Sequence, residues 1–159
     1  MKLSSVKTLF KLFTCAALLS GMYTNAVAAD FVMHRSVHAS TTLPQTVKNE
    51  TQIARERGLK PFVMMYADWC SPCHAIKKHI KHPLMQEAFK GTYVVLINVD
   101  EWEDEIKGKY FVRGIPSFFE ISAAGEPTGK KIDAGAWEDN TPAAMAPVLN
   151  KFFHAQKSK

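Results

Sequence analysis

Residues 69–74 read Trp-Cys-Ser-Pro-Cys-His and place two cysteines, Cys70 and Cys73, two residues apart. A short apolar run at 61–67 precedes the pair, and a segment with helical character follows it. Thiols at this spacing can close a small disulfide ring and reopen it, which is redox chemistry rather than cross-linking. The same letters also spell Cys-x-x-Cys-His, the attachment signature of c-type haem.

The first 29 residues are predicted to be a signal peptide. Three lysines lie within the first eleven residues, an apolar core spans 12–19, and Ala-Val-Ala at 26–28 is typical of a cleavage site. The apolar run is shorter than the ~20 residues of a spanning helix, which disfavours a retained membrane anchor. Cleavage would remove Cys15 and leave the closely spaced pair in an exported, periplasmic protein.

The composition after cleavage is that of one small domain of nearly neutral charge. The chain has 20 Lys and Arg against 15 Asp and Glu, and three of the lysines belong to the leader. The pattern gives no indication of a nucleic-acid partner. A structural role for the cysteine pair is disfavoured as well, because a bridge over so short a loop removes little chain entropy.

Hydrophobic patterning predicts strands that alternate with helices. Strands are expected at 30–38, 62–67, 93–99, 117–121 and 130–134. Helices are expected at 43–57, 70–81, 84–89, 101–108 and 141–154. Pro83 separates the second of these helices from the third. This order predicts an α/β fold with a central mixed β-sheet flanked by helices.

Three separated stretches, 66–73, 112–119 and 133–136, resemble the thioredoxin-fold family of thiol–disulfide oxidoreductases. With residues 81–89, the first stretch is most similar to the C-terminal domain of the DsbD family and related exported thioredoxins. The resemblance implies a thioredoxin fold over 60–155, preceded by an N-terminal strand and helix extension at 30–59.

Cys70 is expected at the N-terminus of a helix, where unpaired N–H groups and the helix dipole favour a thiolate. It is interpreted as the attacking thiol and Cys73, one turn on, as the resolving thiol. The resemblance implies a cis Ile115–Pro116 peptide that faces the disulfide and leaves the backbone of Ile115 free to pair with substrate. An ordinary trans proline is the alternative.

Two further residues are candidates for substrate binding. Trp69 is interpreted as a contact surface beside the thiols, with a plain packing role as the alternative. Gly135 would let a substrate backbone approach closely, or it is simply a turn glycine.

The sequence departs from the family pattern under the cysteines. Thioredoxins usually have a buried aspartate six residues before the first cysteine, paired with a lysine on the next strand, whereas this chain has Met64 and Leu96 there. The usual proton acceptor for the second thiol is therefore absent. Water or His74 could replace it, although His74 also fits a helix surface.

The competing functions are haem attachment through Cys70, Cys73 and His74, and a metal site that adds His79 and His82. Haem attachment leaves the segment around Pro116 and Gly135 unexplained, and no second Cys-x-x-Cys completes a zinc site. The favoured function is a monomeric periplasmic reductase of protein disulfides without a cofactor, recharged by a membrane dithiol donor. An oxidase or isomerase of the same fold is the alternative.

Overall fold

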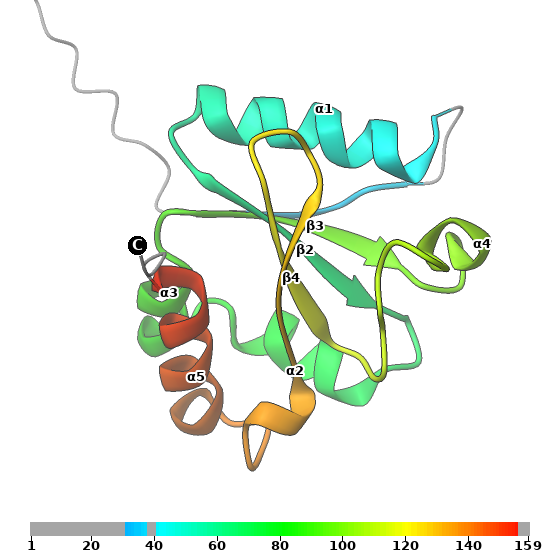
Figure 1. Ribbon diagram of the computed structural model, residues 1–159. Helices are drawn as coiled ribbons and strands as arrows, with labels where there is room; N and C mark the ends of the chain where they lie inside the picture. The colour runs from blue at the N-terminus through cyan, green and yellow to red at the C-terminus, as the bar shows by residue number, and fades with distance from the viewer. Residues whose placement is uncertain (1–30, 38–40, 156–159) are drawn as a thin grey trace, which may run out of the picture.

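Five strands form one mixed sheet in the order β1-β3-β2-β4-β5 in this computed structural model, which describes residues 31–37 and 41–155 (Figure 1). The strands are β1 (Val32–Arg35), β2 (Lys60–Tyr66), β3 (Thr92–Asn98), β4 (Ser117–Ile121) and β5 (Pro127–Asp133). The first three run parallel, and β4 and β5 pair antiparallel to their neighbours. The predicted signal peptide at 1–29 lies outside the described residues.

Helices cover both faces of the sheet. They are α1 (Leu43–Glu56), α2 (Ser71–His79), α3 (Pro83–Phe89), α4 (Glu103–Ile106), the short 3₁₀ helix η1 (Ala134–Ala136) and α5 (Pro142–His154). In Figure 1, α1 lies on the side of the sheet away from α2, α3 and α5. In the described part of the chain no helix is long and apolar enough to span a membrane. The predicted α/β fold with a central mixed sheet is confirmed.

The alternation of side chains along the strands separates the core into two clusters. On β2, Val63 and Met65 pack toward α1 and α4, whereas Phe62, Met64 and Tyr66 pack toward α2, α3 and α5. All five side chains are essentially buried, which explains why β2 is an unbroken apolar run. The second cluster contains both cysteines.

Several predicted boundaries shift. The helix expected at 70–81 ends at His79, and α3 starts at Pro83 after a cap by the His82 side chain. The expected strand at 130–134 begins earlier, at Pro127. Its first half is polar and exposed, so the apolar pattern gives no signal there, and the ladder with β4 decides the extent of the strand.

Glu120 is a buried carboxylate on β4, and it is 4% exposed. It lies opposite Phe62 of β2, away from the cysteines. Its Oε1 lies 2.7 Å from Lys60 Nζ, and Oε2 lies 3.7 Å from Lys130 Nζ and accepts from the Thr128 hydroxyl. Burial by itself raises the pKa of Glu120, but the hydrogen bond and charge of Lys60, aided by Thr128 and Lys130, lower it overall. The ionised form therefore stabilises the fold.

The Glu120→Gln variant should lose stability near neutral pH and progressively less in acid. A lowered native pKa contributes stability above the unfolded pKa of about 4.3, and this contribution disappears as the pH falls through the native pKa. Thermal unfolding between pH 7 and pH 3 measures the gap between variant and wild type. Glu87→Gln, at an exposed carboxylate, is the matched control and should show a much smaller gap. A gap for Glu120→Gln that is constant with pH would contradict the assignment.

Candidate active site

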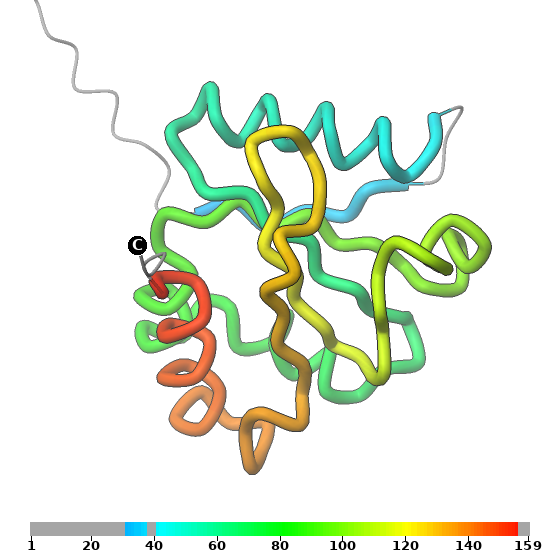
Figure 2. Tube along the Cα trace, viewed as in Figure 1, coloured from blue at the N-terminus to red at the C-terminus, as the bar shows by residue number. Residues whose placement is uncertain are grey.

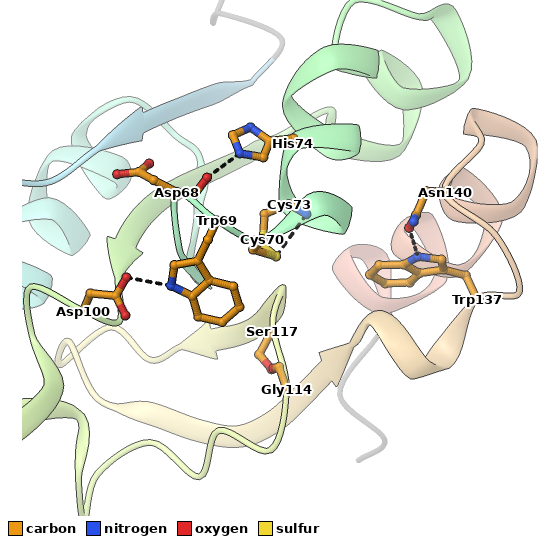
Figure 3. The surroundings of a disulfide bond; sticks show 10 residues. All are labelled: Asp68, Trp69, Cys70, Cys73, His74, Asp100, Gly114, Ser117, Trp137 and Asn140. Carbon is orange, nitrogen blue, oxygen red and sulfur yellow. Dashed lines mark hydrogen bonds between the residues drawn. A yellow bond between two sulfur atoms is a disulfide. The ribbon is translucent and has the colours of Figure 1, made fainter.

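Cys70 and Cys73 are joined by a disulfide at the start of α2, with their Cα atoms 5.3 Å apart (Figure 3). Cys70 is the N-cap of the helix, and its Sγ accepts a hydrogen bond of 3.2 Å from the N–H of Cys73. The same N–H would stabilise a Cys70 thiolate after reduction, together with the helix dipole. Cys70 is 3% exposed and Cys73 is fully buried, so Cys70 is the more accessible sulfur.

The core beneath the disulfide is apolar. Met64 and Leu96 are direct register partners on β2 and β3, and both belong to the cluster that contains the cysteines. Among the described residues Glu120 is the one buried carboxylate, and it lies opposite Phe62, two positions before Met64 along β2. The described part of the chain therefore offers no carboxylate below Cys73 to accept its proton.

Trp69 is the exposed wall of an apolar groove beside the disulfide. Its side chain is 69% exposed, and its indole Nε1–H donates to Asp100 Oδ2 at 2.9 Å (Figure 3). The groove has a volume of about 320 Å³ and is lined by Trp69, Val99, Glu103, Ile106, Lys107 and residues 112–115. The hydrogen bond to Asp100 holds the ring outside the core, so the plain packing interpretation of Trp69 does not apply.

The segment before β4 forms the opposite wall of the groove. The Ile115–Pro116 peptide is cis, the isomer that the family resemblance implies. The Pro116 carbonyl accepts from Ala134 N at 3.1 Å, and the Ser117 hydroxyl donates to the Gly114 carbonyl. Within residues 31–37 and 41–155, no hydrogen bond reaches the backbone of Ile115. That backbone is available to a bound chain.

A polar network near Trp69 was not predicted from the sequence. Arg35, the last residue of β1, pairs with Glu101 and lies 3.9 Å from Asp68, whose carboxylate also accepts from Asn98 Nδ2. The network joins the loops that follow β2 and β3. The available signal was topological, because parallel strands bring the residues after their carboxyl ends to one edge. Figure 2 shows these loops and the chain entering β4 at the same end of the sheet.

The remaining candidates lie at the rim. His74 is exposed, and its Nε2 lies 2.6 Å from the carbonyl of Asp68; since a carbonyl can only accept, Nε2 is the protonated nitrogen. Its ring therefore fastens α2 to the loop before Cys70, as a surface residue (Figure 3). Gly135 lies exposed in η1 with its N–H bonded to Asp133, and it does not line the groove of Trp69 and Ile115.

The haem and metal alternatives gain no support from the geometry. The two cysteine sulfurs form a disulfide with each other, and the His74 ring is hydrogen-bonded to the backbone carbonyl of Asp68. Over the described ranges, no group of three or more His, Cys, Asp or Glu side chains is arranged to hold a metal ion. His79 and His82 are thus not gathered with the cysteines.

The family model for thioredoxin matches residues 42–141, which include the cysteine pair, the groove and the cis peptide. The chain belongs to the thioredoxin family of thiol–disulfide oxidoreductases. The match also includes α1, so part of the predicted N-terminal extension lies within the thioredoxin region.

Individual relatives agree with the thioredoxin assignment. The thiol:disulfide interchange protein TxlA of Synechococcus elongatus is 33% identical over 90 residues, 55% of this chain and 45% of that protein. Protein disulfide-isomerase A3 of Gallus gallus is 25% identical over 118 residues, 70% of this chain and 23% of that protein. The chain thus spans less than half the length of these two relatives.

A solved structure shows the same fold. The disulphide isomerase from Xylella fastidiosa Temecula1 superposes with a TM-score of 0.52 at 18% identity, over 74% of this chain and 92% of that one. At this identity the likeness concerns the thioredoxin fold alone.

Proposed function

We propose that this protein reduces disulfides in exported proteins of the periplasm through the Cys70–Cys73 dithiol. The observation that carries the proposal is the position of Cys70, which caps α2 next to an exposed tryptophan and an apolar groove. Its sulfur is the more accessible of the pair, and one backbone N–H already points at it.

The reaction proceeds in two exchanges. The Cys70 thiolate attacks one sulfur of the substrate disulfide, forms a mixed disulfide and releases the other substrate sulfur as a thiolate. The Cys73 thiol then loses its proton and attacks Cys70 Sγ, which closes the Cys70–Cys73 disulfide and releases the second substrate sulfur. Two electrons pass to the substrate. Because Met64 replaces the usual aspartate, the Cys73 proton leaves to water in this scheme.

Substrate binding is assigned to the walls of the groove. Trp69 supplies an apolar contact beside the attacked sulfur, and the backbone of Ile115, preceding Pro116, pairs with an extended substrate segment. Gly135 is retained as a more distant position where a substrate backbone can approach. No cofactor is required, because the electrons are carried by the cysteines themselves.

The reducing direction is supported by Pro72, which precedes the second cysteine as in reducing thioredoxins. The predicted signal peptide supports a periplasmic location. Because that compartment is oxidising, sustained reduction requires a membrane dithiol donor that returns electrons to Cys70 and Cys73.

The reduction potential of the Cys70–Cys73 couple tests this direction. Equilibration of the purified protein with glutathione buffers, followed by thiol alkylation and mass analysis, should give a potential near that of thioredoxin, about −270 mV. A value near −120 mV, as for the oxidant DsbA, would contradict the reductase proposal. A value near −180 mV would favour an isomerase, the activity named for the Gallus gallus relative.

A further inference from the structure

The helix α2 and the turn after it carry a group of exposed and half-buried basic side chains that the redox reaction does not use. We call this group the α2 basic stripe; it consists of Lys77, Lys78 and Lys81 with His74, His79 and His82. A shallow hollow over the helix is lined by Ser71, His74, Ala75, Lys77, Lys78 and His79. Ser71 lies inside the Cys70–Cys73 ring, so the hollow begins at the disulfide.

The lysines of the stripe have no carboxylate partners among the described residues. Residues 69–86 contain no Asp or Glu. In the part of the chain that the structure describes, none of the three lysines forms an ion pair, and Lys77 instead lies 4.5 Å above the Tyr66 ring. Lys60, Lys107 and Lys109, by contrast, have carboxylates at 2.7–2.9 Å. The positive potential of the stripe is therefore not neutralised within the described fold.

The opposite side of the disulfide carries several carboxylates. Beyond Trp69, the segment into α4 contributes Asp100, Glu101, Glu103 and Asp104. Lys107 neutralises part of this charge through Glu103 and Asp104, and Arg35 pairs with Glu101. In Figure 3 the Trp69 ring and Asp100 lie on one side of the disulfide, and His74 lies on the other. An acidic chain would be attracted on the α2 side, whereas the carboxylates on the α4 side already have cationic partners in Lys107 and Arg35.

We propose that the α2 basic stripe docks an acidic segment of the protein whose disulfide Cys70 attacks. This inference rests on the proposed function and names its substrate class: a disulfide flanked by acidic residues. Lys78 lies seven residues after Ser71, about 10 Å along a helix that rises 1.5 Å per residue. An extended chain covers that distance in about three residues. The acidic side chains are therefore expected about three positions from the attacked cysteine.

Matched peptide disulfides test the docking surface. Three fluorogenic peptides would contain the same disulfide and apolar residues, with Glu, Gln or Lys at two to four positions from the cysteine on both sides. The reduced protein should react with the Glu peptide roughly tenfold faster than with the Gln peptide at low salt, and slowest with the Lys peptide. The preference should largely vanish near 1 M salt, where the Debye length is about 3 Å.

Charge reversal on the stripe provides the decisive comparison. The Lys78→Glu/Lys81→Glu variant should bring the Glu-to-Gln rate ratio to one or below. Lys48→Glu, which makes the same kind of change on α1 across the sheet, should retain the wild-type ratio. Co-sedimentation with vesicles of phosphatidylglycerol tests separately whether the stripe binds an anionic membrane surface.

Equal rates with all three peptides would overturn the docking surface and leave the reductase proposal intact. Equal rates together with vesicle binding that the double variant abolishes would reassign the stripe to a membrane surface. If no peptide is reduced at all, the proposed function fails, and the substrate class that rests on it fails with it.

Discussion

The Cys73→Ala variant should accumulate as a covalent complex with its substrates, whereas Cys70→Ser should lose disulfide reduction by more than about a thousandfold. The structure supplies the reason. Cys70 is the accessible sulfur at the N-cap, and Cys73 is fully buried three residues later. Without the second thiol, the mixed disulfide on Cys70 has no internal group to resolve it.

The measurement is non-reducing electrophoresis after acid quenching, with mass spectrometry of the trapped partners. The Cys70→Ser/Cys73→Ala double variant is the matched control and should trap nothing. Adducts on Cys70→Ser in place of Cys73→Ala would reverse the assigned roles of the two cysteines. Trapped partners also report on the substrate class, since their reactive cysteines should be flanked by acidic residues if the α2 basic stripe docks them.

The Met64→Asp variant should lower the free energy of unfolding by about 3–5 kcal/mol, the cost of an uncompensated buried charge. Met64 is fully buried beneath the disulfide, and its partner Leu96 offers no charge. The conservative Met64→Leu variant should change stability by less than about 1.5 kcal/mol. Urea unfolding of the oxidised protein, monitored by circular dichroism, measures both.

A second substitution sharpens this result. Because Met64 and Leu96 are direct cross-strand neighbours, Leu96→Lys should recover part of the loss when it is combined with Met64→Asp. The coupling between the two substitutions should be favourable in a double-mutant cycle. Additive losses, or an unperturbed Met64→Asp protein, would show that water reaches this position and that the site is not apolar.

Local sequence accounts for most of the architecture. The unbroken apolar runs of β2 and β3 are buried on both faces, so their composition alone identifies central strands. Thr141 and Pro142 mark the start of α5 in the way that capping requires. The first half of β5 was not predictable in this way, because a polar, exposed edge strand has no hydrophobic period and is defined by its pairing with β4.

For the candidate site as well, local sequence predicted one part and not the other. The spacing of Cys70 and Cys73 placed two thiols at a predicted helix start, and the preceding strand, the segment around Pro116 and the predicted export together favoured redox chemistry over a haem or metal site. The absence of charge at Met64 and Leu96 was equally visible in the sequence. The cysteine spacing is a local feature of the sequence. Met64 and Leu96 were identified as strand neighbours through the resemblance to thioredoxins.

Only the tertiary structure decided what surrounds that pair. The bonds from Trp69 to Asp100, and from Arg35 to Glu101, join residues more than thirty positions apart. These contacts form because the carboxyl ends of parallel strands lie at one edge of the sheet. No local sequence pattern predicts which side chains meet at that edge. The placement of lysines on the α2 side and of carboxylates on the α4 side likewise follows from folding, since short-range sequence determines each helix but not their placement on two sides of one disulfide.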